Sequence, residues 1–214
     1  MQLPPVPGGV ILSNREMEKG KGLSTLDIVF TAATSAIVGA IFLIWSNFAW
    51  DLAKLALGLT FLPLIYGVWF IGATIPAYVI RKPSVALLGE FLAAVAELVY
   101  GTQFYSTALL YGFMQGLMSE LVFLATRYRR WDITTMMLAG AAPALWAAPA
   151  DFLLYGLGAP LSWSERLIFW SMYFVSGAIF AGVLVKLVLD EVAKLGVLDA
   201  FPLGRVVRMS EQSR

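Results

Sequence analysis

Residues Ser84–Tyr100 read SVALLGEFLAAVAELVY, an apolar run that carries two carboxylates, Glu90 and Glu97. These two residues are seven apart, which places them on one face of a helix, two turns from each other. A charged side chain at the centre of a membrane helix costs roughly 2.5–3.5 kcal/mol or more, so a membrane protein keeps one there only with a partner or a function. The run therefore predicts a membrane helix with a polar face turned to the protein interior.

The composition of the whole chain places this helix in a lipid bilayer. Of the 214 residues, 59% are hydrophobic and 14% are charged, whereas soluble domains carry about 25% charged residues. The absence of His and Cys from the sequence excludes disulfides, Cys or His nucleophiles and an ordinary zinc site. No Walker-type phosphate-binding loop occurs either, so we expect no nucleotide hydrolysis, no metal and no cofactor in this chain.

Apolar stretches long enough to span a bilayer recur along the chain. The sequence predicts an all-α integral membrane protein with about six transmembrane helices. The expected helices are Thr25–Phe48, Leu57–Ile80, Ser84–Tyr100, Ser106–Arg127, Ile133–Leu157 and Trp163–Leu195. Residues 1–23 are expected to form a cytoplasmic arm, residues 24–198 the six-helix domain, and residues 199–214 a polar cytoplasmic tail.

The basic residues predict the orientation. Most of them flank one set of loops and both termini, whereas the opposite loops carry only Lys54 and Arg166. The first set consists of Arg15, Lys19, Lys21, Arg81, Lys82, Arg127, Arg129, Arg130, Lys186, Lys194, Arg205, Arg208 and Arg214. Because cytoplasmic loops carry an excess of Lys and Arg, both termini are expected in the cytoplasm of a multi-pass protein of the cell membrane.

Glu97 is the strongest candidate for a ligand contact. The third expected helix enters from the inner side after Pro83, and a rise of 1.5 Å per residue puts Glu97 about 20 Å deep, beyond the reach of the basic inner loops. An intramembrane carboxylate without a basic partner is by default a functional site.

The other three intramembrane carboxylates leave alternatives open. Glu90 and Glu120 lie at a shallower depth, where they either bind a ligand, pair with Arg or Lys side chains that reach in from the loops, or share a proton. Asp151 is expected near the outer end of the fifth helix. It either faces a pocket together with Glu97, caps a helix end, or pairs with Arg166.

Aromatic and amide side chains are expected at a similar depth. Tyr66 and Trp69 are three apart and share a helix face, and aromatic faces attract cations. Gln115 lies in the middle of the fourth helix, where its amide either binds a ligand or joins two helices. A carboxylate between aromatic walls suits a flat cationic heteroaromatic, although most aromatic residues in membrane helices only pack or contact lipid.

Small residues repeat along the first helix. Ala32, Ala36 and Ala40 are spaced by four, a pattern that lets another helix approach closely. The ordinary interpretation is packing within the chain, and the more specific one is a surface for a partner subunit.

Several of these stretches resemble a known family. They are YGVWFI at Tyr66–Ile71 and AYVIRKP at Ala77–Pro83, followed by Glu90 and Glu97, then Gln115-Gly116 and ELVFLATR at Glu120–Arg127. With these motifs the chain resembles the YkoE-type S components of energy-coupling factor (ECF) transporters, which take up thiamine or its hydroxymethylpyrimidine precursor.

The resemblance implies a six-helix membrane subunit that binds its vitamin from outside and works with a transmembrane coupling subunit and two ATPase subunits. It implies substrate contacts from Glu97, Trp69, Tyr66, Gln115 and Asp151, with Glu90, Glu120 and Asn47 as further candidates. Asn47 lies at the outer end of the first helix, where a helix cap is the alternative role. Docking on the partner is implied for Ala32, Ala36 and Ala40.

Three other function classes remain as alternatives. A stand-alone proton-coupled carrier of a small cationic aromatic metabolite would use the inner carboxylates as proton sites, and uptake without ATPase partners would favour it. An intramembrane enzyme is disfavoured because His and Cys are absent and Asp151 is the only Asp deep in an expected span. A purely structural membrane subunit would bind no ligand and would tolerate Glu97→Gln.

Overall fold

The computed structural model describes residues 22–212, and these residues form helices joined by short turns, without a strand. The helices run in the order α2 Thr25–Ile44, η1 Trp45–Ala49, α3 Trp50–Phe61, η2 Leu62–Phe70, α4 Ile71–Ile80, α5 Val85–Tyr100, α6 Thr107–Ala125, α7 Ile133–Ala141, α8 Ala144–Leu154, α9 Trp163–Gly177, η3 Ala178–Leu184, α10 Val185–Lys194 and α11 Pro202–Gln212. The all-α membrane fold is therefore confirmed for the described part of the chain. The cytoplasmic arm with Arg15, Lys19 and Lys21 lies outside the described residues, apart from its last two positions.

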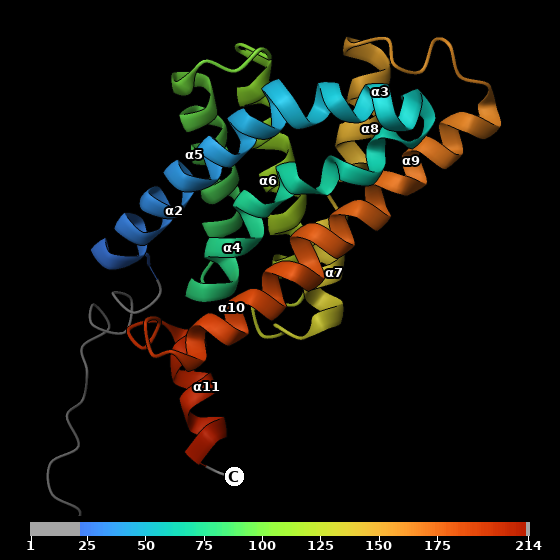
Figure 1. Cartoon of the computed structure of the whole chain (residues 1–214). Helices are drawn as coiled ribbons and strands as arrows, with labels where there is room; N and C mark the ends of the chain where they lie inside the picture. Colours follow the sequence, from blue (N-terminus) through green and yellow to red (C-terminus); the bar gives the residue numbers. More distant parts are fainter. Residues whose placement is uncertain (1–21, 213–214) are drawn as a thin grey trace, which may run out of the picture.

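The first two expected helices form one continuous helical segment that reverses direction. Ser24 opens it with a capping box, in which its hydroxyl accepts from the Asp27 backbone amide and the Asp27 carboxylate accepts from the Ser24 amide. Gly58 has φ 68° and ψ 175°, a conformation that a side chain would make costly. The chain turns there, so that η2 and α4 run back beside α2 (Figure 1).

Helix α5 lies between α2, α4 and α6 (Figure 1). Small residues permit these approaches, since a Cβ at Gly39 of α2 would lie 2.5 Å from the Ala96 Cβ and one at Gly112 of α6 would lie 2.4 Å from the Ala94 Cβ. Close backbone packing of this kind is the usual way for membrane helices to associate. The polar face of α5 is thereby held inside the bundle, as the sequence predicts.

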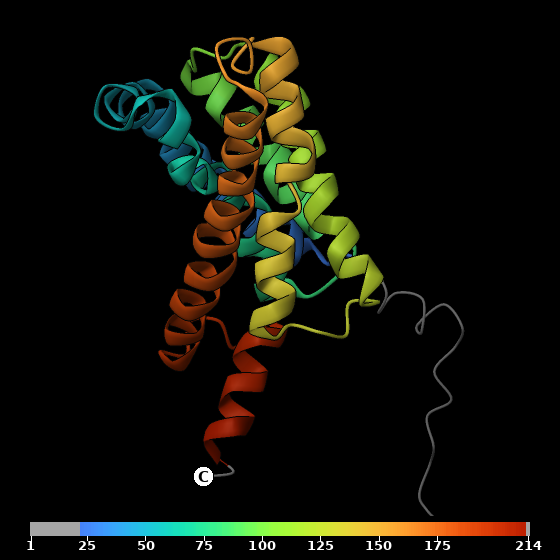
Figure 2. The same ribbon diagram turned by 90° about the vertical axis from the view of Figure 1, so that its right-hand side faces the viewer.

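The fifth and sixth expected helices differ in continuity. The fifth breaks into α7 and α8 at Pro143, which begins α8 and cannot donate a backbone hydrogen bond. The sixth is continuous through α9, η3 and α10, with a π-helical segment in its middle, and it runs the length of the bundle (Figure 2). Within the polar tail, Pro202–Gln212 folds into α11.

Length and composition mark four described segments as candidate membrane spans, namely Thr25–Ile80, Thr107–Ala125, Ile133–Leu154 and Trp163–Lys194. The first of them contains 56 residues, or about 84 Å of straight helix, whereas the hydrocarbon core is about 30 Å thick. The segment thus has the length of two crossings with a reversal. The total of six spans and the cytoplasmic position of both termini stay predictions.

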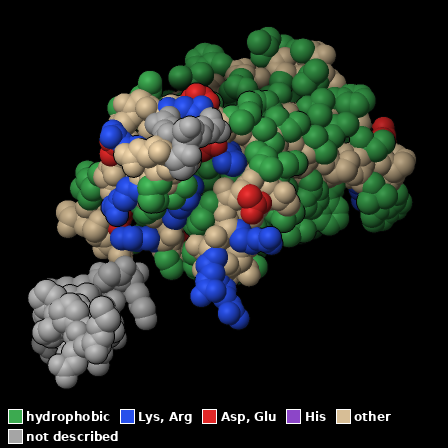
Figure 3. Space-filling model, turned by 90° about the horizontal axis from the view of Figure 1, so that it is seen from below, with side chains coloured by type: hydrophobic (Ala, Val, Ile, Leu, Met, Phe, Trp, Pro, Cys, Tyr) green, Lys and Arg blue, Asp and Glu red, His purple; other side chains and the backbone are tan. Residues whose placement is uncertain are grey.

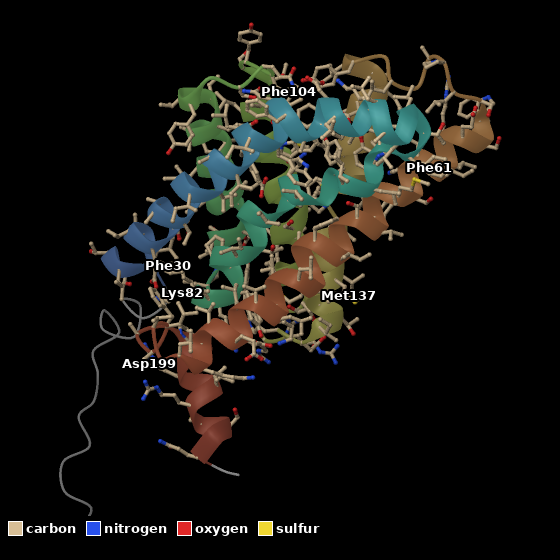
Figure 4. The ribbon with its side chains drawn as sticks, viewed as in Figure 1. Phe30, Phe61, Lys82, Phe104, Met137 and Asp199 are labelled. Atoms are coloured by element: carbon tan, nitrogen blue, oxygen red, sulfur yellow. The ribbon has the colours of Figure 1, made fainter. Side chains whose placement is uncertain are left out.

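The buried residues form two apolar clusters at opposite ends of the bundle. One surrounds Tyr66, Trp69 and Tyr173 below α3, and the other joins the ends of α4 and α6 to α10 and α11. Phe104 lies near the first end, and Lys82 and Asp199 lie near the second (Figure 4). The first cluster borders the candidate site.

We predict that Gly140→Ala destabilises the bundle. A Cβ at Gly140 would lie 2.4 Å from the Gly177 carbonyl oxygen and 2.6 Å from the Gly182 amide nitrogen, and backbone atoms cannot move aside cheaply. We expect a loss of about 1–3 kcal/mol, measured as a lower melting temperature in detergent. Gly22→Ala is the control, because a Cβ there meets nothing within 4 Å; equal melting temperatures for both variants would contradict this packing.

Candidate functional site

A cavity of about 150 Å³ lies inside the bundle, near the end that carries α3. Its walls come from α2, α3, η2, α5, α6, α8 and the two turns that follow α5 and α8. The lining residues are Phe42, Trp50, Lys54, Tyr66, Trp69, Glu90, Ala94, Glu97, Phe104, Ala108, Tyr111, Gly112, Gln115, Asp151, Tyr155 and Leu157. Six of the eight predicted ligand contacts are among them: Tyr66, Trp69, Glu90, Glu97, Gln115 and Asp151.

Glu97 is buried on the last turns of α5 and is held by one of its two carboxylate oxygens. Its Oε1 accepts from the Ser46 hydroxyl at 2.6 Å and from the Thr102 hydroxyl at 2.9 Å. Ser46 in turn accepts from the Trp69 indole nitrogen at 3.2 Å. Oε2 accepts no hydrogen bond from a described residue, so this oxygen is the part of the carboxylate left for the cavity.

Glu90 lies two turns earlier on the same face of α5 and is 1% exposed. Its Oε2 accepts from the Ala73 amide at 2.6 Å, which belongs to the first turn of α4. Amides in the first turn of a helix lack a partner within the helix, and the helix dipole favours a negative group there. The other oxygen, Oε1, is buried without a hydrogen-bond partner among the described residues, so Glu90 has unused bonding capacity beside the cavity.

Tyrosine hydroxyls hold Asp151 in place. Tyr111 donates to its Oδ1 at 2.6 Å, and Tyr173 donates to its Oδ2. Both carboxylate oxygens are thus occupied, and the expected alternative of an ion pair with Arg166 is not realised, because Arg166 donates to the carbonyl groups of Gly158 and Leu161. Asp151 therefore lines the cavity with both of its carboxylate oxygens held by tyrosine hydroxyls.

Gln115 supplies a polar group with no competing partner. It lines the cavity from the middle of α6 and is 3% exposed, yet its amide makes no hydrogen bond to a described residue. A side-chain amide offers two donors and one acceptor oxygen. One turn on either side of it on α6 lie Tyr111 and Ser119, and only Tyr111 shares the cavity.

Aromatic rings form one wall of the cavity. The rings of Trp50 and Trp69 lie 4.8 Å apart, as do those of Tyr66 and Trp69, both pairs edge to face. Phe104 lies 6.0 Å from Trp69 on the other side. Interlocked aromatic rings of this kind keep a rigid surface on which a flat ligand can stack.

The cavity carries an excess of negative groups. Three carboxyl groups line it, those of Glu90, Glu97 and Asp151, against one basic residue, Lys54. Lys54 is half-exposed at the cavity edge and pairs with Asp51 at 2.9 Å. No group of three or more metal-ligating Asp, Glu, His or Cys side chains occurs among residues 22–212. The arrangement suits an organic ligand that is flat, polar at one edge and cationic.

Two predicted ligand contacts, Glu120 and Asn47, lie outside the cavity lining. Glu120 accepts from the backbone amides of Ser84, Ala86 and Leu87 at 2.6–3.2 Å and from the Tyr128 hydroxyl at 2.7 Å. It therefore caps the first turn of α5, away from the cavity, where a helix terminus favours an anion. Asn47 also does not line the cavity, because its neighbour Ser46 occupies the buried position of that turn.

The alanine repeat lies beside the face of α2 that packs on α5, and the Tyr100 hydroxyl of α5 donates to the Ala36 carbonyl at 3.3 Å. Ser35 and Gly39 face α5, with the Ser35 hydroxyl donating to the Gly89 carbonyl at 2.9 Å. Ala32 is exposed, and Ala36 and Ala40 are partly exposed. Packing within the chain therefore covers this surface only in part and leaves Ala32 exposed.

Four site residues were not singled out as contacts from the sequence. Ser46 and Thr102 anchor Glu97, and Tyr111 and Tyr173 anchor Asp151. One signal for Ser46 was present, since Ser35, Phe42 and Ser46 recur at intervals of seven and four on one helix face. Thr102 had no such signal, because it lies in a turn.

Three comparisons with known proteins each return a component of a transport system. A family model described as an ABC-type cobalt transport system permease component matches residues 26–146. The putative HMP/thiamine permease protein YkoE of Bacillus subtilis (strain 168) is 35% identical over 188 residues, which are 88% of this chain and 94% of that protein. A crystal structure of an S-component of ECF transporter superposes with a TM-score of 0.84 at 32% identity, covering 90% of this chain and 96% of that one.

We predict that Glu120→Ala destabilises the protein, because Ser84, Ala86 and Leu87 lose the acceptor of their amides. Unsatisfied buried amides cost about 1–3 kcal/mol. The melting temperature in detergent is the measurement, and Glu191→Ala is the control, since Glu191 pairs only with the neighbouring Lys194 at the surface. Equal stability of the two variants would show that the amides are satisfied in another way.

Proposed function

Because this chain belongs to the YkoE-type S components of energy-coupling factor transporters, we propose that it captures thiamine or its hydroxymethylpyrimidine precursor from outside the cell. Delivery inward would be driven by ATP hydrolysis on separate subunits. The observation that supports this substrate class most directly is the free Oε2 of Glu97 in a cavity walled by aromatic rings.

The chemistry of the ligand matches the side chains of the cavity. Thiamine carries a permanent positive charge on its thiazolium ring, which the three carboxyl groups would stabilise. Trp69 and Tyr66 would stack on a ring, with a cation–π attraction of about 2 kcal/mol when water is excluded. The amide of Gln115 and the free Oε1 of Glu90 would bond the edge of the aminopyrimidine, which presents both ring nitrogens and an amino group.

The size of the cavity bears on how the ligand would lie. A closed apolar cavity of about 150 Å³ accepts one benzene ring, and the volume here is similar. The pyrimidine ring would thus fill the interior, and the thiazolium ring of thiamine would extend toward Trp50 at the edge, where Asp51 neutralises the charge of Lys54. Asp151 would act on the ligand through the hydroxyl of Tyr111, which also lines the cavity.

The proposed assembly follows from the same family membership. A transmembrane coupling subunit and two ATPase subunits would energise transport, and the partly exposed Ala32, Ala36 and Ala40 would dock on the coupling subunit. With both termini in the cytoplasm of the cell membrane, the cavity would open outward, because α11 lies at the opposite end of the bundle (Figure 1).

Titration of the purified protein in detergent tests the substrate. We expect thiamine and hydroxymethylpyrimidine to quench tryptophan fluorescence saturably, because Trp50 and Trp69 line the cavity, and riboflavin to leave it unchanged. Glu97→Gln should weaken thiamine binding at least about tenfold, or 1.4 kcal/mol. The uncharged pyrimidine should lose less affinity if Glu97 meets the thiazolium.

Glu191→Gln serves as the control for charge, since Glu191 lies on the far end of the bundle. Unchanged thiamine affinity in Glu97→Gln would remove Glu97 from the site. Absence of binding by both thiamine and the pyrimidine would refute the substrate, and uptake by this chain alone, without ATPase subunits, would support the stand-alone carrier instead.

Docking has its own test. Ala32→Trp should abolish co-purification with the coupling subunit, because a large ring on the alanine surface keeps another helix away, while ligand titration stays as in the unaltered protein. Ala33→Trp is the matched control, since Ala33 is equally exposed but lies one position outside the repeat. Equal co-purification of both variants would rule out this surface as the docking site.

A further inference from the structure

A second hollow lies at the end of the bundle opposite the cavity. It is a groove of about 520 Å³ between the C-terminus of α4, the turn that precedes α7, and helices α10 and α11. Seen from this end, Lys and Arg side chains gather on the surface beside apolar patches (Figure 3). None of its lining residues belongs to the cavity.

The groove carries positive charge that its own acidic residues do not neutralise. Of its two acidic residues, Asp190 pairs with Lys186 at 2.7 Å and Glu191 pairs with Lys194 at 2.6 Å. The two remaining basic residues, Arg81 and Arg129, form no ion pair with a described residue. Two guanidinium groups are therefore left for an external anion.

The structure holds Arg81 in a defined position. Its guanidinium lies 5.0 Å from the Tyr78 ring and 5.7 Å from the Trp131 ring, and its Nε donates to the Tyr78 carbonyl at 3.2 Å. Trp131 is fixed in turn by its indole nitrogen, which donates to the Tyr128 carbonyl at 3.0 Å. The two terminal nitrogens of Arg81 make no hydrogen bond to a described residue. Both can therefore donate to two oxygens of one phosphate group.

An apolar surface adjoins these cations. Leu187 of α10 and Val206 of α11 line the groove and are 53% and 45% exposed. A free phosphate ion or an acidic peptide would bring little to cover them, whereas a phospholipid presents an anionic headgroup and an acyl chain side by side. Basic pockets at the membrane surface between helices bind such headgroups.

We propose that this groove binds an anionic phospholipid, with Arg81 and Arg129 on the phosphate and Leu187 and Val206 against the acyl chain. With both termini in the cytoplasm, the lipid belongs to the inner leaflet. The site is separate from the cavity and independent of which vitamin the cavity binds. A lipid bound in the groove holds α4, α10 and α11 at the membrane surface.

Native mass spectrometry of the full-length protein in detergent tests the site, with phosphatidylglycerol and phosphatidylcholine added in turn. We expect phosphatidylglycerol to be retained with at least about tenfold higher affinity. Replacing both Arg81→Gln and Arg129→Gln should abolish this preference. The pair Arg127→Gln and Arg130→Gln removes the same charge from the neighbouring exposed turn, outside the groove, and should preserve it.

Three results would overturn the proposal. Equal retention of both lipids by the unaltered protein would show that no anionic site exists. Equal loss in the two double variants would reduce the effect to surface charge. Displacement of phosphatidylglycerol by an equal concentration of glycerol phosphate would show that the apolar wall plays no part. Melting temperatures of both variants, compared with the unaltered protein, check that the fold is intact.

Discussion

Helix α5 carries carboxyl groups into a bundle where no basic side chain of residues 22–212 pairs with them, and the surrounding structure supplies their hydrogen-bond donors. In a membrane a buried anion without donors is costly. Each carboxylate therefore receives neutral donors, which are one backbone amide for Glu90 and two hydroxyls for Glu97. Hydroxyl and amide donors bring no counter-charge, so a cation in the cavity would meet these carboxyl groups without a competing ion pair from a described residue.

The carboxylates divide their bonding capacity between the fold and the cavity. Both carboxylate oxygens of Glu120 accept hydrogen bonds, from backbone amides at the start of α5 and from the Tyr128 hydroxyl. Glu90 and Glu97 each use one oxygen to fix a neighbouring element and keep the other unbonded. An anchored side chain with a free oxygen loses little further entropy on binding a ligand, which is the physical advantage of preorganisation.

The two ends of the bundle have opposite electrostatic character. The cavity end concentrates carboxyl groups among aromatic rings, and the other end concentrates Lys and Arg beside apolar helix faces. Helices α4 and α5 extend between these ends, together with the long helix α9–η3–α10 (Figure 1). This polarity supports the two proposals, a cationic solute in the cavity and an anionic lipid in the groove.

The sequence by itself determined the membrane class, the expected helices and the shared face of Glu90 and Glu97, because composition and the 3.6-residue period are local properties. It also carried the family, through motifs that stay recognisable without coordinates. Only the tertiary structure decided which carboxylate serves which purpose. Glu120 caps residues 33 to 36 positions earlier in the chain, and Ser46 rather than Asn47 reaches Glu97 across 51 positions. Such pairings depend on how α2, α5 and α6 pack through their small residues, and no local pattern records that contact.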